Sequence, residues 1–160
     1  MALTQLAYNS TEGCVAYGQH RNVIQSVGAT RQLTAAESGS LCLFDRTAGN
    51  TYTLPTPVAG MYFDFAVSVS VTASDTHKLI TKTVASEFLL GSVSMVTIAT
   101  ASPAGFSANG TNIVAVTMTA TTAGGLLGGV IRVVAISATQ WQVSGLLVGS
   151  GTIITPFATS

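Results

Sequence analysis

His20 and His77 carry the side chains best suited to hold a metal ion or to act as a base near neutral pH. A zinc or hydrolytic site would need one of them beside converging carboxylates or thiols. Cys14 closely precedes His20, and His77 begins a predicted strand near Asp75. A histidine without such neighbours is more often satisfied in the core or exposed to solvent, and we expect this state for both.

The six carboxylates form no pattern that suits acid–base catalysis, because no two are spaced as a paired acid and base. They are Glu12, Glu37, Asp45, Asp64, Asp75 and Glu87. Glycine-rich phosphate-binding motifs are absent, and Gly149-Ser150-Gly151 lacks the G-x-S-x-G frame of a nucleophile elbow. The sequence therefore predicts that the protein is not an enzyme and has no catalytic residue, cofactor, metal site or small-molecule substrate.

Two aromatic residues could bind a sugar or a partner by stacking. Trp141 lies between two glutamines in TQWQVSG, and Tyr62 lies on the polar face of an alternating segment. A tryptophan ring offers an apolar face together with an N–H donor. Because Trp141 occupies the apolar position of an alternating strand, we expect it in the core instead.

Cys14 and Cys42 are expected to be free, buried thiols. The first residues lack the basic start and the continuous apolar stretch of a signal peptide, and disulfides are rare in proteins that stay in a reducing cytoplasm. No apolar run reaches the length of a membrane span. We therefore expect synthesis in a cytoplasm and no association with a membrane.

The composition favours strands and surfaces that other subunits cover. Charged residues make up only 8% of the 160 residues, against about 25% in a typical soluble domain, while 39 residues are serine or threonine. Interface cores are depleted in charge, and domains with zero net charge tend to associate. The six cations are scattered along the chain, so we expect no binding of nucleic acid.

The order of segments predicts an all-β, single-domain β-sandwich or Greek-key barrel of about nine to eleven short strands in residues 20–160. Its strongest strand is 61–71, where apolar and polar residues alternate. Segment 77–81 is expected to pair with that strand through the turn 73–75. Residues 101–111 are expected to form a loop with a turn at Asn109-Gly110.

Two further features complete the predicted organisation. Residues 1–19 form an extended N-terminal arm, which could pack on its own domain or lie across a neighbouring subunit. Thr34 and Glu37 have the spacing of a capping box and predict one short helical turn that Gly39 ends. The glycine-rich tract 123–129 predicts a flexible or tightly turning connection.

Two segments resemble virion proteins of tailed bacteriophages. They are LTAAESGSLCLFDRTAGNTYTLPTPVAGMYFDFAV (33–67) and GGVIRVVAISATQWQVSGLLVGSGTIITPFATS (128–160). The first is similar to a turn, strand and "TLP.P..G" connection in those proteins, and the second to their "W.V.G...GSG...TPF" ending. The resemblance implies a capsid decoration (cement) protein, a homotrimer made in the bacterial cytoplasm that binds the major capsid protein on the outer surface of the virion.

This resemblance adds no catalytic residues and agrees with a role in adhesion. We expect the assembly interface to include Leu3, Leu6, Tyr8, Arg21 and Phe157, and the tract 123–129 to reach a neighbouring subunit. The alternative function is a receptor- or carbohydrate-binding module of a phage tail or fibre, in which Trp141 or Tyr62 would stack on a sugar.

Overall fold

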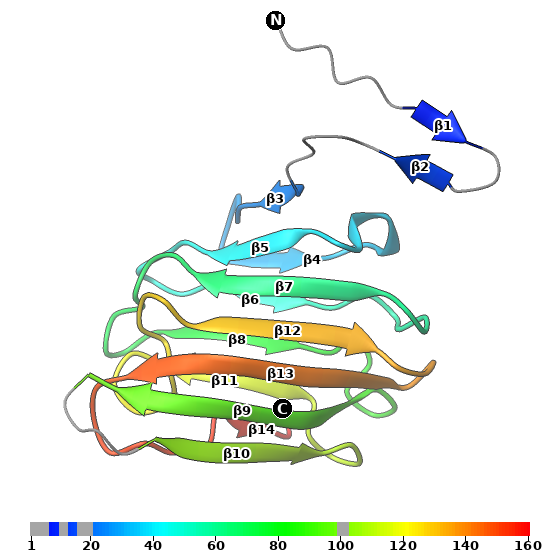
Figure 1. The fold of residues 1–160 in the computed structure, drawn as a ribbon. Helices are drawn as coiled ribbons and strands as arrows, with labels where there is room; N and C mark the ends of the chain where they lie inside the picture. The colour runs from blue at the N-terminus through cyan, green and yellow to red at the C-terminus, as the bar shows by residue number, and fades with distance from the viewer. Residues whose placement is uncertain (1–6, 10–12, 16–20, 99–102) are drawn as a thin grey trace, which may run out of the picture.

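The computed structural model describes residues 7–9, 13–15, 21–98 and 103–160, and it shows an all-β sandwich of two packed sheets (Figure 1). The predicted fold class is confirmed. The two layers hold seven and five strands, somewhat more than expected, because several connections contribute strands of only two or three residues.

The larger sheet has β10 and β3 as its edges. In spatial order its strands are β10 (Ala104–Asn109), β9 (Phe88–Thr97), β13 (Gln140–Gly149), β12 (Val130–Ala135), β7 (Tyr62–Val67), β5 (Leu41–Phe44) and β3 (Val23–Ile24).

The smaller sheet has β14 and β4 as its edges. In spatial order its strands are β14 (Phe157–Ala158), β11 (Ala115–Thr119), β8 (Thr76–Ile80), β6 (Thr51–Thr53) and β4 (Thr30–Gln32).

Successive strands from β3 to β9 alternate between the two sheets. This alternation makes β3, β5 and β7 parallel neighbours in one layer and β4, β6 and β8 parallel neighbours in the other. The predicted pairing of 77–81 with 61–71 is therefore wrong. The turn 73–75 carries the chain across the core, so β7 pairs with β5 and β12, and β8 pairs with β6 and β11.

Alternation within β7 places its side chains as predicted. Phe63, Phe65 and Val67 are buried, whereas Tyr62 and Asp64 are partly exposed on the outer face. The strand ends at Val67, earlier than expected. Facing it, Tyr52 and His77 of the smaller sheet meet Phe44 and Phe65 with ring centroids 5.0–5.7 Å apart, and this aromatic cluster fills the centre of the core.

The expected helical turn is present as the 3-10 helix η1 (Ala35–Glu37). The Glu37 carboxylate accepts hydrogen bonds from the Thr34 N–H (2.8 Å) and the Thr34 hydroxyl (3.0 Å). Gly39 follows with a φ of 90°, a value that glycine adopts without steric cost. The capping-box prediction is confirmed.

The loop predicted for 101–111 is largely a strand, β10, and this prediction is wrong for that segment. Its small residues carry little strand preference of their own, and pairing with β9 supplies the order. The turn at Asn109-Gly110 is present: Gly110 has a φ of 76°, and the Asn109 side chain accepts a hydrogen bond from the Thr111 N–H.

The predicted N-terminal arm falls mainly on residues outside the described ones. Within it, β1 (Ala7–Asn9) and β2 (Gly13–Val15) pair antiparallel as a two-stranded sheet. Leu3, Leu6 and His20, like the side chains of Tyr8 and Cys14, lie outside the described residues.

Candidate assembly surface

Charge is distributed very unevenly between the two parts of the sandwich. Residues 88–160 contain one ionisable side chain of the Asp, Glu, Lys or Arg types, that of Arg132. These residues, which we call the charge-poor half, form all strands from β9 to β14. In Figure 1, β9, β10, β11, β13 and β14 lie together in the lower part of the view, away from β3 and β5.

The outer face of the larger sheet carries a cluster of aliphatic side chains within this half, which we call the aliphatic patch. Its members are Val96, Ile98, Val130, Leu146 and Val148. Of these, Ile98, Val130 and Leu146 are between 43% and 74% exposed.

Strand register brings the members of the aliphatic patch together. Val130 of β12 lies opposite Leu146 of β13, and Val148 of β13 lies beside Val96 of β9. The Ile98 N–H donates to the carbonyl of Gly149 at 3.0 Å, which brings Ile98 to the same end of the sheet. The patch therefore spans three adjacent strands.

These side chains face outward because alternate residues of each strand fill the core. Leu147 of β13 and Met95 of β9 are fully buried, which turns Leu146, Val148 and Val96 to the opposite face. No helix covers that face among the described residues. An exposed aliphatic cluster in a region that lacks charge is the composition of an interface core and suits a contact with another protein surface.

A charged cluster marks the border of the aliphatic patch. Arg132 of β12 lies opposite Asp64 of β7, with 3.7 Å between Nε and Oδ1, and Arg21 lies 2.6 Å from the other oxygen of Asp64. The Arg132 guanidinium also lies 4.9 Å from the ring centroid of Tyr62. A depression of about 280 Å³ is lined by Asp64 and Arg132 of this cluster together with Val130.

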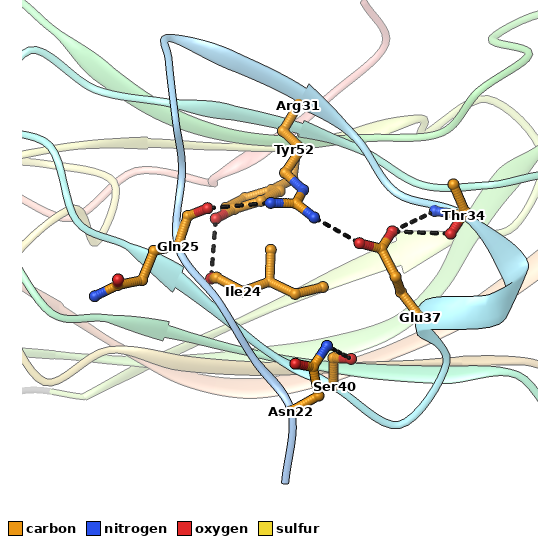
Figure 2. A network of polar contacts seen from close by, with 8 residues as sticks. All are labelled: Asn22, Ile24, Gln25, Arg31, Thr34, Glu37, Ser40 and Tyr52. Carbon is orange, nitrogen blue, oxygen red and sulfur yellow. Dashed lines mark hydrogen bonds and ion pairs between the residues drawn. The ribbon is translucent and has the colours of Figure 1, made fainter.

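The far edge of the sandwich is closed by a polar network that joins β3 and β4 (Figure 2). Arg31 of β4 forms an ion pair with Glu37 at 2.5 Å and donates a hydrogen bond to the Gln25 carbonyl at 3.2 Å. The buried Tyr52 hydroxyl lies 3.3 Å from the carbonyl of Ile24, the last residue of β3. The polar groups of this network bond to one another within the chain, so the network stabilises this edge.

Electrostatics in this network keeps Glu37 ionised. Partial burial by itself raises the pKa of Glu37, but hydrogen bonds from Thr34 and Arg31 outweigh that effect and hold the pKa below its ordinary value of 4.5. The ionised Glu37 carboxylate therefore stabilises the turn at every pH above this lowered pKa.

His77 and Cys42, two of the residues that could do chemistry, are buried in the core. His77 is fully buried, with Nε2 2.9 Å from the carbonyl oxygen of Val69. Burial lowers the pKa of His77 and thus favours its neutral form. Cys42 is a buried thiol, as predicted, and burial raises its pKa to about 12. The described residues contain no group of three or more His, Cys, Asp or Glu side chains placed to hold a metal ion.

Most carboxylates are bound by neighbouring backbone or hydroxyl groups. The Ser26 hydroxyl donates to Asp45 at 2.5 Å, and the Thr72 hydroxyl donates to Asp75. The buried Glu87 accepts from two backbone N–H groups of the adjacent turn. Glu12 lies outside the described residues. Each described carboxylate thus has a hydrogen-bond or ion-pair partner.

Of the residues predicted for the assembly interface, Arg21 and Phe157 have described side chains, and these lie in different environments. Arg21 is exposed and lies at the border of the aliphatic patch, where its guanidinium also donates to the Gly39 carbonyl. Phe157 is only 8% exposed and packs in the core from β14, so its side chain is not presented at the surface.

Trp141 and the glycine-rich tract also lie inside the fold. Trp141 is fully buried, as predicted, 6.1 Å from the ring of Phe63, and is not available as a stacking platform. Within the tract 123–129, Gly124 and Gly125 are buried, and an added Cβ at Gly124 would lie 2.6 Å from Leu147. The tract is a tight turn packed on its own domain, and only Leu127 projects from it.

Sequence reasoning missed the aliphatic patch. One signal was available in the chain: eleven of the twelve charged residues precede residue 88. Which apolar residues in that half stay exposed depends on the order of the strands, which the sequence does not reveal.

No protein-family model matches the chain, and no curated protein matches it. None of the described helical segments has the length and apolar character needed to span a membrane.

Proposed function

We propose that this protein is a capsid decoration (cement) protein of a tailed bacteriophage. It binds the outer surface of the phage head and stabilises the head through contacts that bridge major capsid subunits. The observation that carries the proposal is the aliphatic patch, an exposed apolar cluster bordered by the ion pair of Arg132 and Asp64.

A rigid sandwich with such a face is suited to adhesion and not to catalysis. Burial of apolar surface contributes about 25 cal/mol per Å², and the contact needs no charged group to be desolvated except at its border. The partners in this proposal are the major capsid protein and two further copies of this chain in a homotrimer. Once one copy of such a trimer is bound to the head, the other two copies are held at a high effective concentration near their own binding sites.

The proposed place of action is the outer surface of the virion, after synthesis in the bacterial cytoplasm. The distribution of charged residues favours a protein surface over nucleic acid as the binding partner. Among the described cations, Arg21, Arg31 and Arg132 lie in ion pairs, and the charge-poor half offers no row of cations to a phosphate backbone.

A binding assay tests this function directly. Purified protein is mixed with undecorated heads, and bound protein is measured after sedimentation of the heads. The proposal predicts stoichiometric, saturable attachment and heads that resist heating better once decorated. Absence of attachment, together with specific binding to a glycan array, would favour the tail or fibre module instead.

The burial of Trp141 weakens that alternative. The tryptophan is enclosed between the sheets, and the Tyr62 ring is in contact with the Arg132 guanidinium. Neither aromatic ring therefore offers a free platform of the kind on which a sugar stacks.

A further inference from the structure

The four edges of the two sheets differ in a way that singles out β10. Strands β3 and β14 have two residues each, and β4 has three, one of which is the ion-paired Arg31. Strand β10 has six residues. Soluble proteins protect sheet edges by making them short, charged or covered, because an open edge pairs with other chains. Three edges follow this rule, and β10 does not.

Composition leaves the β10 edge without protection. Its sequence, AGFSAN, contains no charged residue, and the charge-poor half supplies none nearby. Pro103 precedes the strand and has no N–H group, so it limits the edge at that end without interrupting it. A Cβ at Gly105 would meet no atom within 4 Å, so a side chain placed there would find open space over the face of the strand.

The register identifies which backbone groups are unpaired. Strand β10 pairs antiparallel with β9 alone, and the Gly110 N–H donates to the Leu89 carbonyl at 2.9 Å. In an antiparallel ladder, hydrogen-bonded positions alternate. Ala104, Phe106 and Ala108 therefore direct their N–H and C=O groups toward β9. The same groups of Gly105, Ser107 and Asn109 point outward, where no described strand meets them.

We infer that the β10 edge is a two-fold contact between two copies of this chain. Antiparallel pairing of the outward groups is satisfied best when Ser107 lies opposite Ser107 of the second copy. Gly105 then lies opposite Asn109 in both directions, so that all outward-facing positions of the strand form hydrogen-bonded pairs. A second copy fits this edge because the strand is uncharged and complementary to itself, and the two copies do not repel each other.

This contact is independent of attachment to the phage head. A two-fold contact adds to the three-fold contacts proposed above and would join trimers in pairs. It uses the side of the larger sheet beyond β9, whereas the head-binding proposal rests on the outer face formed by β9, β12 and β13.

Cysteine cross-linking tests the register. In a background of Cys14→Ser, the variant Ser107→Cys is compared with Gly105→Cys under mild oxidation; both positions lie in β10, and Ser107 and Gly105 are exposed. Opposed residues in a hydrogen-bonded pair have Cα atoms about 5.5 Å apart, within disulfide range, while the two Gly105 positions would be about 14 Å apart. We expect an intermolecular disulfide from Ser107→Cys and none from Gly105→Cys. Equal cross-linking of both variants, or of neither, would overturn the inference.

Native mass tests the contact itself in purified protein without phage heads. The double variant Gly105→Lys/Ser107→Lys places like charges across the two-fold axis and should halve the native mass measured by light scattering. The matched control, Thr30→Lys/Gln32→Lys, adds the same charge at exposed positions of β4 and should leave the mass unchanged. A β10 variant with the mass of the wild type refutes the contact, even if the protein still binds heads.

Discussion

Arg132 lies opposite Asp64 across β12 and β7, and the guanidinium Nε is 3.7 Å from the carboxylate. The one charged residue of the charge-poor half is thus paired with a residue of the charged half, by which we mean residues 1–87 with the other eleven charged side chains. Beyond it, the outer face bears aliphatic, hydroxyl and amide side chains. The proposed attachment to the phage head depends on that separation of charge from apolar surface.

Close packing of β9 on β13 makes a strong prediction at Gly91. Its φ is 130°, and an added Cβ would lie 2.1 Å from the carbonyl oxygen of Val143, a backbone atom that cannot move aside. Gly91→Ala should lower the free energy of unfolding by about 2–4 kcal/mol, measured by chemical denaturation. Gly105→Ala, in open space, is the control and should change it by less than about 0.5 kcal/mol. Similar losses in both variants would contradict the described packing.

Stability should fall in mild acid because of His77. Burial holds the pKa of the folded-state imidazole below its unfolded value near 6.5. The unfolded chain therefore binds the proton at higher pH, and the free energy of unfolding declines as pH falls from about 6.5 through the folded-state pKa. The largest slope that one such group can add is about 1.4 kcal/mol per pH unit.

Replacement of the imidazole isolates this effect. In a His20→Gln background, His77→Phe should flatten the dependence of unfolding free energy on pH between about 6.5 and 5, even if it lowers the stability at pH 7.5. A slope equal to that of the His20→Gln parent would show that His77 does not titrate on unfolding. Glu37, whose pKa is lowered in the folded state, contributes a further loss only below about pH 4.5.

The thiol of Cys42 should be inert in the folded protein. It is fully buried, and its pKa is raised to about 12, so almost no thiolate is present near neutral pH. In a Cys14→Ser variant, we expect no reaction with a thiol-specific chromogenic reagent in buffer and one equivalent in denaturant. Rapid labelling in buffer would contradict the placement of Cys42 in the core.

Local sequence patterns predicted the local structure well. Period-two alternation gave the buried face of β7, and the spacing of Thr34 and Glu37 gave the helical turn. The sequence could not show which of the two sheets contains segment 77–81. Its alternation is the same whether that strand pairs with 61–71 or crosses the core to the other sheet. Strand β10 was missed since Ala, Gly and Ser acquire strand structure from pairing with β9.

The candidate surface was less predictable than the fold. The run GVIRVVAIS is typical of a strand, but the sequence does not say whether Val130 is covered by another layer or left exposed. Exposure of Val130 and Leu146 follows from the absence of a described element over this face, which is a property of the whole topology.

Removal of residues 1–19 tests the predicted role of the arm in assembly. The arm supplies Leu3, Leu6 and Tyr8 as apolar residues that need a surface. The truncated protein should fold, as judged by circular dichroism, and should lose trimerisation or attachment to heads. A truncated protein that assembles and decorates heads like the full chain would rule out this role.

Head binding by a variant of the aliphatic patch tests the central claim most directly. Leu146→Glu puts a charge at the centre of the patch, and Val27→Glu puts the same charge on a side chain that is 95% exposed in the charged half. Both should fold with near wild-type stability, since exposed substitutions usually change it by less than about 0.5 kcal/mol. Sedimentation with undecorated heads should show at least about tenfold weaker binding for Leu146→Glu, a loss of about 1.4 kcal/mol, and unchanged binding for Val27→Glu. Equal binding by the two variants would contradict the claim that this patch attaches the protein to the phage head.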